Sequence, residues 1–396
     1  MQLEQLGAWV DARATEIENW LETLVNMNTF TANTAGVDAG MDKMYELVDQ
    51  LGFTVEAVNA RHRLVKSGNA TQGPRILLIS HMDTVFPPDG DFLEYRRVDD
   101  EFVTGPGVGD IKGGLLMGLY AMKAISELLP DSDVQMVVSA NEEIGSPTIR
   151  DWYMGENIDA DFAIGLEPGF PQGELTADVP LGVVDQRRGY CAINATIYGK
   201  EAHSGVPHEG LNAIDGLAQR IIKINALNAP ERGISTNIGT ISGGTAGNTM
   251  AGVAKALITF RYETMADGEA TKAAVEEIIT TPTAHNSQLD VWDRGEFEVN
   301  IFIPPMERNE RNQYLVDTVL EEAQRLGHNV VPIARGGGSD ANYVSAGGTP
   351  SICGMGAPCV GLHSPTETIH FPMMIRRIEL LAATLYRVLT EAGAKA

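Results

Sequence analysis

Cysteine is scarce in this sequence of 396 residues, and the three cysteines, Cys191, Cys353 and Cys359, form no CxxC pair. An odd number of widely spaced thiols argues against a disulfide framework, so we expect reduced, buried side chains. Long apolar runs are also missing, since no stretch approaches the roughly 18 residues of a membrane span. The N-terminal segment lacks both the basic and the unbroken apolar regions of a secretory signal. We therefore expect a cytoplasmic protein without a membrane partner.

Basic residues are also few: 29 Lys and Arg stand against 53 Asp and Glu, which gives a formal net charge of −24. Nucleic-acid binding needs clustered cations that neutralise phosphates, so this balance argues against a nucleic-acid partner. What the sequence does contain is an ordinary hydrophobic fraction of 43%. That fraction is enough for a folded core, and the length favours two domains over one. The composition is that of a soluble enzyme.

The first half of the chain alternates helix and strand patterns. Apolar residues recur at helical spacing between Leu6 and Leu24, which predicts one amphipathic N-terminal helix. Further along we expect strands over residues 75–80, 134–140 and 161–167, and helices over 41–51 and 113–129. Such alternation predicts a mostly parallel sheet covered by helices, with the chemistry at the carboxyl ends of the strands.

The pattern changes near residue 187. Strands of alternating polarity are expected over 191–199 and 255–263, and helices over 211–224 and 271–279. Together they indicate a smaller α+β unit with an open sheet face. Helical and buried-strand patterns like those of the first half then resume. We therefore expect one catalytic domain in two segments, 1–186 and 298–396, with a lid domain at 187–297 inserted between them.

Acidic residues and histidines follow several of the apolar runs in turn-rich contexts. These residues are His81, Asp110, Glu142, Glu143, Glu167 and His363. Imidazoles and carboxylates delivered from strand ends into one place are the ligands of a Zn²⁺-type site. A spare carboxylate beside such a site can act as the general base of metal-assisted hydrolysis. The pattern therefore favours a two-metal hydrolase.

No single one of these motifs decides the matter. The pair His81 and Asp83 is also typical of a surface histidine beside a turn. Asp110 in GPGVGDIKGG could cap the following helix. The adjacent Glu142 and Glu143 are equally compatible with a solvated turn. The glycines before Asp110 fit neither phosphate-binding pattern, because the G-K-[ST] ending is missing and the aspartate occupies the final glycine position.

The order and spacing of the motifs resemble those of the M20 metallopeptidase family, and the resemblance is closest to its glutamate carboxypeptidase branch. The sequence runs H-x-D, G-P-G-x-x-D-x-K-G-G, E-E-x-G, L-E-P, then a lone histidine near the C-terminus. The segments GKEAHSGVPHEGLNAI, GGTAGNTM, FRYE and GGGSDANY are also similar to family segments. The resemblance implies an α/β, zinc-exopeptidase-like catalytic domain with a mostly parallel sheet. It also implies that the inserted α+β domain serves as a lid and dimerisation domain.

The resemblance further implies two divalent metal ions per subunit, expected to be Zn²⁺, with Co²⁺ or Mn²⁺ as alternatives. His81 and Glu167 would bind one ion, Glu143 and His363 would bind the other, and Asp110 would bridge the pair.

The remaining roles are also implied by the resemblance. Glu142 would be the general base, and Asp83 would support His81 from behind. His203 would cross to the partner subunit of a homodimer and stabilise the oxyanion. Asn248 and Arg261 would clamp a substrate carboxylate, although a surface ion pair is the alternative for Arg261. The guanidinium suits bidentate carboxylate binding.

These roles imply hydrolysis of a C-terminal peptide bond or an N-acyl amino acid bond in a small substrate, as in a carboxypeptidase or dipeptidase. Two alternatives stay open. An aminoacylase or N-deacetylase of the same family would carry the same metal motifs. A catalytically silent binder of amino-acid conjugates belongs to another class, and the intact Glu142 and complete ligand set argue against it.

Overall fold

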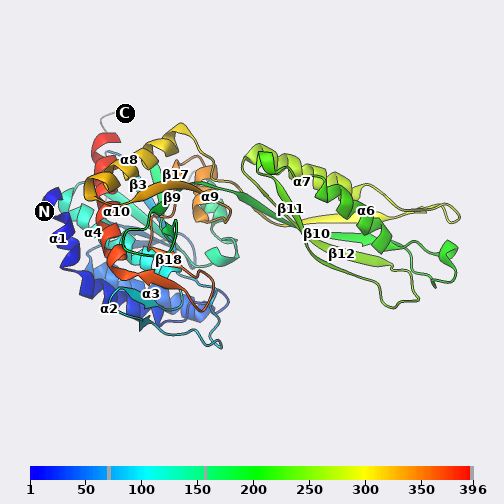
Figure 1. The fold of residues 1–396 in the computed structure, drawn as a ribbon, viewed down its shortest axis with the longest axis horizontal. Helices are drawn as coiled ribbons and strands as arrows, with labels where there is room; N and C mark the ends of the chain where they lie inside the picture. Colours follow the sequence, from blue (N-terminus) through cyan, green and yellow to red (C-terminus); the bar gives the residue numbers. More distant parts are fainter. Residues whose placement is uncertain (69–72, 156–157, 393–396) are drawn as a thin grey trace. The chain divides into compact units, whose positions relative to one another are not determined.

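The computed structural model describes residues 1–68, 73–155 and 158–392, and the chain divides into two compact units (Figure 1). The first unit comprises Met1–Gln186, Arg308–Arg335 and the segment that begins at Ser339. The second comprises Arg187–Glu307 and Gly336–Gly338. The second unit continues past the boundary that we expected at residue 297. The reason is that strand β15 (Arg294–Ile303) pairs along its length with β10 (Gly189–Tyr198) of the same unit.

The first unit is built on a six-stranded sheet of order β1-β2-β6-β3-β7-β17. Its strands are β1 (Thr54–Ala57), β2 (Arg63–Lys66), β3 (Arg75–His81), β6 (Asp133–Ser139), β7 (Phe162–Gly165) and β17 (Ser351–Ile352). The central strand β3 is parallel to both β6 and β7, and β17 is parallel to β7. Only β2, near one edge, runs antiparallel to its neighbours β1 and β6. The prediction of a mostly parallel sheet is confirmed.

Helices cover this sheet and bury apolar faces against it. The main ones are α3 (Thr34–Gln50), α4 (Gly114–Leu128), α8 (Glu310–Leu326) and α10 (Phe371–Glu391). Helix α4 packs against β3 and β6, and α10 packs against α4 and α8. The prediction of a single N-terminal helix is wrong: α1 (Leu6–Asp11) and α2 (Ala14–Val25) are separate. Both helices still bury apolar residues of the predicted helix. The periodicity therefore predicted which side chains are buried, but not that the helix is interrupted between Asp11 and Ala14. Among the described helices, none combines the length and apolarity that crossing a membrane requires.

Two small sheets complete the first unit, and the sequence patterns did not predict them. One has the order β16-β9-β8, and the other β18-β19-β5-β4. Their strands are β4 (Arg96–Arg97), β5 (Phe102–Thr104), β8 (Phe170–Pro171), β9 (Leu181–Arg187), β16 (Val330–Arg335), β18 (Cys359–Val360) and β19 (Thr368–His370). Most are too short for a periodic pattern. The second sheet matters for function because it brackets the loop that carries His363.

The second unit is a four-stranded antiparallel sheet of order β11-β12-β10-β15 with two helices. Its other main elements are β11 (Ser235–Gly243), β12 (Val253–Tyr262), α6 (Ala213–Asn225) and α7 (Met265–Thr280), and the short strands β13 (His285–Asn286) and β14 (Val291–Trp292) form a separate hairpin. Alternate residues of β12 are buried against a separate hydrophobic core, as the alternating polarity of this segment predicted. Both helices contact β10 and β12, so one sheet face is covered by helices.

Candidate metal centre

The predicted ligands gather at the carboxyl edge of the parallel sheet. His81 ends β3, and Glu167 follows the end of β7. Glu142 and Glu143 lie in a short 3-10 turn directly after β6. Because β3, β6 and β7 are parallel, their carboxyl ends meet at one edge of the sheet. Asp110 precedes α4 and His363 lies between β18 and β19, and both side chains reach this edge.

The ligand atoms form two groups that share Asp110. One group is His81, Asp110 and Glu167, and the other is Asp110, Glu143 and His363. Within each group the candidate ligand atoms all lie within 4.8 Å of one another. Asp110 Oδ1 is 3.3 Å from His81 Nε2, while Asp110 Oδ2 is 3.2 Å from His363 Nε2. Each oxygen of this carboxylate therefore faces a different imidazole, which is the arrangement needed to bridge two cations.

Unpaired buried atoms provide an independent test of whether the residues fit metal ions. His81 Nε2, Asp110 Oδ1 and Glu143 Oε1 are buried without a hydrogen-bond partner in the described part of the chain. A buried polar atom without a partner is costly, so these three atoms call for a further ligand. Nitrogen and oxygen donors in groups of three with open positions are the chemistry of catalytic divalent metal sites. The residues present fit two such ions.

Asp83 acts on the adjacent glutamates more than on His81. We expected its carboxylate to hold the imidazole, but His81 Nδ1 lies 2.9 Å from the main-chain oxygen of Asp83 and 3.4 Å from its Oδ1. A carbonyl can only accept, so Nδ1 carries a proton, and Nε2 is the ring atom that faces the centre and is available to a cation. The carboxylate of Asp83 accepts the backbone N–H groups of Glu142 at 3.0 Å and Glu143 at 3.2 Å. It also accepts the Thr31 hydroxyl at 2.7 Å.

The electrostatics show a cluster that holds protons when no cation is present. Burial, followed by the charge of Glu167, raises the pKa of Glu142 well above its usual range. Burial and the charge of Asp110 raise the pKa of Glu143 to about 8. The hydrogen bond to Asp110 raises the pKa of His363 to about 9. Crowded carboxylates that cannot all ionise together are stabilised by a nearby cation.

The turn that carries Asp110 depends on glycine at two positions. Gly107 has φ of 75°, a left-handed conformation that side chains rarely adopt. A Cβ on Gly109 would lie 2.2 Å from Cys359 Sγ, which leaves no room for a larger residue. The Asp110–Ile111 peptide bond that follows is cis.

Glu367 fixes the same turn and was missed by the sequence analysis. Its Oε1 accepts the backbone N–H groups of Gly109 at 2.8 Å and Asp110 at 3.1 Å. Because Glu367 and His363 share one loop, this contact ties the turn of Asp110 to the loop of His363. Its burial, which makes a carboxylate without partners costly, is evident only in the folded structure.

Asp340 was quoted in the motif GGGSDANY without a role, and it holds the segment with the adjacent glutamates. The side chain is buried, and Oδ2 accepts the hydroxyls of Ser139 and Tyr153, each at 2.8 Å. Oδ1 accepts the hydroxyl of Ser146. Ser139 ends β6 and Ser146 follows the 3-10 turn, so Asp340 contacts both ends of the segment that carries Glu142.

The three residues predicted for the lid belong to the second unit. His203 pairs with Thr249 in an isolated bridge, and Ser204 donates its backbone N–H to the Asn248 oxygen at 2.9 Å. The structure thus brings His203 and Asn248 into neighbouring segments. Asn248 precedes β12, whereas Arg261 lies near the other end of that strand. From Val253 to Arg261 alone the strand extends roughly 26 Å at about 3.3 Å per residue. Within one chain, Asn248 and Arg261 are therefore not brought together.

Arg261 lies on the sheet face away from the core and stacks on an aromatic ring. Its neighbours Phe260 and Tyr262 are buried, so it lies on the opposite strand face, as predicted. The guanidinium lies over the ring of Tyr190, 4.8 Å from the centroid, and Nη1 donates to the Gly336 oxygen. No carboxylate of the described residues forms an ion pair with it. The surface ion pair that was the alternative for Arg261 is therefore not seen among the described residues.

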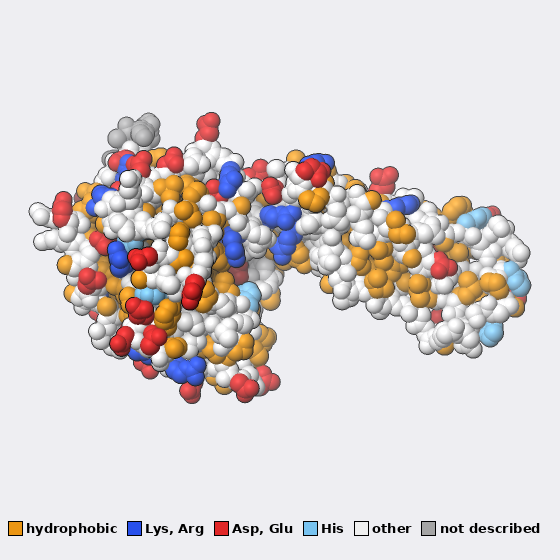
Figure 2. Space-filling model, viewed as in Figure 1, with side chains coloured by type: hydrophobic (Ala, Val, Ile, Leu, Met, Phe, Trp, Pro, Cys, Tyr) orange, Lys and Arg blue, Asp and Glu red, His pale blue; other side chains and the backbone are white. Residues whose placement is uncertain are grey.

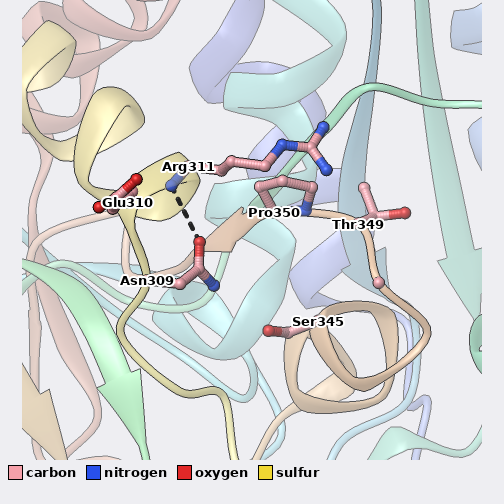
Figure 3. Close-up of a pocket in the computed structure, with 7 residues that line it drawn as sticks. Asn309, Glu310, Arg311, Ser345, Thr349 and Pro350 are labelled. Atoms are coloured by element: carbon pink, nitrogen blue, oxygen red, sulfur yellow. Dashed lines mark hydrogen bonds between the residues drawn. The ribbon is translucent and has the colours of Figure 1, made fainter.

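The three cysteines and the pocket of Figure 3 lie outside the ligand groups. All three thiols are free and buried, as expected. The pocket, of about 460 Å³, is lined by residues of the first unit, among them Asn309, Arg311 and Pro350 (Figure 3). Asn309 Oδ1 accepts the backbone N–H of Arg311 at 3.0 Å, which caps α8. This side chain therefore has a structural partner, and the pocket contains none of the predicted site residues.

Comparison with known proteins places this centre in a family. The sequence pattern of peptidase family M20/M25/M40 matches residues 77–387. Carboxypeptidase G2 of a Pseudomonas species is 26% identical over 388 residues, which cover 94% of this chain and 88% of the relative. The structure of aminopeptidase PepT of Bacillus cereus has a TM-score of 0.77 and 22% identity, and the match covers 95% of this chain and 98% of that one.

A second solved structure, the YXEP protein of Bacillus subtilis, is described as a dinuclear metal-binding peptidase of family M20. It has a TM-score of 0.68 and 15% identity, and the match covers 96% of this chain and 99% of that one. The fold is therefore that of an M20 peptidase. Because the family pattern spans most of the sequence, the chain belongs to the M20/M25/M40 peptidase family and is a hydrolase of the metallopeptidase type.

Proposed function

We propose that this protein is a dinuclear metallohydrolase that cleaves a C-terminal peptide bond or an N-acyl amino acid bond. The observation that carries the proposal is the pair of ligand groups sharing Asp110. His81 and Glu167 would hold one ion, Glu143 and His363 the other, with Asp110 bridging. When bound, divalent ions of this kind polarise a carbonyl and lower the pKa of water. Zn²⁺ suits the donor set, and Co²⁺ or Mn²⁺ are alternatives.

Glu142 is the carboxylate left over for proton transfer. It belongs to neither ligand group, and its Oε2 lies 3.9 Å from His81 Nε2, so it stands beside the centre. We assign it the general-base role: it takes the proton of the attacking water and passes it to the leaving amine. Asp83 and Asp340 support this role, because they hold the backbone segment on which Glu142 is mounted.

Arg261 is the proposed site for the free carboxylate of the substrate. A partly exposed guanidinium without an acidic partner, oriented by Tyr190, is suited to bind a carboxylate by two parallel hydrogen bonds. This assignment predicts substrates that carry a C-terminal carboxylate. A carboxypeptidase, a dipeptidase and an aminoacylase all meet that condition.

The separation of Asn248, before the start of β12, from Arg261, near its end, supports a homodimer through the second unit. If both side chains and His203 serve one substrate, then His203 and Asn248 must come from one subunit and Arg261 from the other. Strand β11 is the edge of its sheet and could pair with another copy. Exposed apolar side chains also occur on this unit: Ile222 is 71% exposed and Ile241 on β11 is 58% exposed. Figure 2 shows hydrophobic side chains gathered on a face of the second unit.

The experiment that tests the proposal is a hydrolysis panel with controlled metal content. The purified protein is stripped by chelation and reloaded with Zn²⁺, Co²⁺ or Mn²⁺. Each form is then assayed on dipeptides, N-acyl amino acids and their amides. We expect no turnover without metal and restored turnover on at least one carboxylate-bearing substrate. Full turnover at a measured metal content near zero would refute the proposal. A protein that loads metal but hydrolyses nothing would instead be a silent binder.

A further inference from the structure

A second polar pocket lies in the first unit and has no part in the proposed chemistry. Its volume is about 180 Å³, and it lies between residues 177–181, the start of β16 and the first turns of α10. At about 30 Å³ for each molecule in liquid water, that is room for several waters or one small polyatomic ion. Its basic lining residues are His328, Arg376 and Arg377.

Arg377 is a buried charge without a counter-ion. The side chain is only 2% exposed. Nε donates to the Gly356 oxygen at 3.0 Å and Nη2 to the Gly354 oxygen at 2.9 Å. Nη1 is buried and has no hydrogen-bond partner in the described chain. Among the residues that the structure describes, no carboxylate forms an ion pair with it either. Because a guanidinium stays ionised in proteins, such a charge is costly unless an anion offsets it.

The neighbouring groups are consistent with an anion. Within the ranges that the structure covers, Arg376 is exposed and makes no ion pair, and His328 Nε2 is buried without a hydrogen-bond partner. Burial, together with the charges of Arg376 and Arg377, lowers the pKa of His328 to about 4. Asp178 also lines the pocket but forms no ion pair with either arginine. The chain as a whole has a net charge of −24. The grouping of two arginines and a histidine with unused donors around one cavity therefore contrasts with its overall acidic character.

We propose that this pocket binds a small oxyanion, either a phosphate group or a carboxylate. Arg377 Nη1 donates from the buried end, Arg376 from the open end, and neutral His328 through an Nε2–H. Val179, Leu181 and Met373 supply an apolar wall. This site is separate from the ligand groups around Asp110, and the inference does not depend on the proposed hydrolase activity.

The test uses the full metal-loaded protein and inorganic phosphate, at constant ionic strength set with chloride. Binding is followed by calorimetric titration and by the shift of the unfolding temperature. Sulfate and acetate serve as further probes, since they distinguish a tetrahedral anion from a carboxylate. Arg376→Gln is the central variant, because this exposed side chain can be changed without disturbing the core. Arg96→Gln is the matched control, since it removes the same charge from an exposed position of the same unit.

We expect saturable binding of at least one of the three anions. Arg376→Gln should weaken it about tenfold or more, because a charge-assisted hydrogen bond is lost, while Arg96→Gln should leave it unchanged. Arg376→Glu should abolish it. Phosphate could also bind at the metal centre, but that binding would survive Arg376→Gln. Binding that is equal in wild type and Arg376→Gln, or no saturable binding by any of the three anions, would overturn the inference.

Discussion

The carboxylate of Asp83 accepts the backbone N–H of Glu142 at 3.0 Å, so one buried aspartate positions the proposed general base. The same side chain accepts the N–H of Glu143, a proposed metal ligand, at 3.2 Å. Its main-chain oxygen accepts from His81 Nδ1. Asp83 therefore holds His81, Glu142 and Glu143 in place. Its hydrogen bonds go to His81 Nδ1 and to backbone N–H groups, so His81 Nε2 and the two glutamate carboxylates stay available for the proposed chemistry.

This geometry predicts the effect of Asp83→Asn. The new amide nitrogen cannot accept a hydrogen bond, so one of the two backbone N–H groups loses its partner. We expect metal affinity to fall by roughly ten- to a hundredfold, together with turnover. Metal titration and steady-state kinetics measure both. Thr31→Val is the matched control, since it removes only a donor to Asp83 and should have the smaller effect. Equal effects of the two substitutions would contradict this account of Asp83.

Substitution of Glu142 and of the adjacent Glu143 should impair different properties of the protein. Glu143 belongs to a ligand group and Glu142 does not, so Glu143→Gln should lose metal at one position, whereas Glu142→Gln should retain both ions and the fold. Turnover of Glu142→Gln should nevertheless fall by two to four decades, as is typical for loss of a general base. Metal analysis beside kinetics decides the assignment. A Glu142→Gln variant that lost an ion, with Glu143→Gln keeping both, would show that the roles are reversed.

Strand-end motifs predicted part of the group of residues that the structure brings together. His81 and Glu167 follow apolar runs, and parallel strands bring such ends to one edge of the sheet, so local pattern and topology together suffice. Glu367 and Asp340 could not be found in this way. Each acts through contacts to segments more than 180 residues away in the chain, and their surroundings become polar only after folding. The short sheets that place Glu367 consist of strands too brief to show alternation.

The boundary of the inserted unit shows a second limit of sequence patterns. β15 begins within the expected lid but continues past residue 297, because its register with β10 is set across the sheet and not by local composition. The distance between Asn248 and Arg261 could not be predicted either. Two motifs in the same domain do not indicate that one lies before the start of a strand and the other near its end. Conversely, the alternation in β12 correctly placed Arg261 on the face away from the core.

The homodimer can be tested by mixing two inactive variants. His203→Ala and Glu142→Gln subunits should each have little activity alone. In a mixed dimer, one site combines the intact Glu142 of the first with the intact His203 of the second, so part of the turnover should return. The measurement is activity after subunit exchange, which is confirmed independently by a mass tag. Complete exchange without recovered turnover would show that His203 does not act across subunits.

His62 predicts a pH dependence of stability below neutrality. Its Nδ1 accepts the backbone N–H of Ala140 at 3.1 Å, and its Nε2 lies 2.7 Å from Thr148 Oγ1, so the buried ring is neutral. Burial, with a contribution from Arg61, lowers the pKa of His62 to about 4 from 6.5.

The sign follows from the preference of the native state for the neutral ring. The stability contribution of His62 is present above pH 6.5 and is lost as the pH falls through about 4, because the unfolded chain takes up the proton first. Denaturant unfolding of metal-free wild type and His62→Gln across this range measures it. The difference in unfolding free energy should shrink towards acid pH. A difference that stays constant from pH 7 to pH 4 would contradict the prediction.

Substrate selection should depend on Arg261. A charge-assisted hydrogen bond to a carboxylate is worth roughly 1.5–3 kcal/mol. Arg261→Ala should therefore reduce kcat/KM by about one to two decades, at about 1.4 kcal/mol per decade. Amidation of the substrate carboxylate should cost the wild-type enzyme a similar factor and barely affect the variant, since the contact is already lost. Such non-additivity is the signature of a direct contact.

Lys255→Ala is the matched control, because it removes a cation from an exposed position of the same strand and should leave the discrimination intact. If Arg261→Ala discriminates against the amide as strongly as wild type does, the carboxylate is bound by another group, and the stacking of Arg261 on Tyr190 is structural.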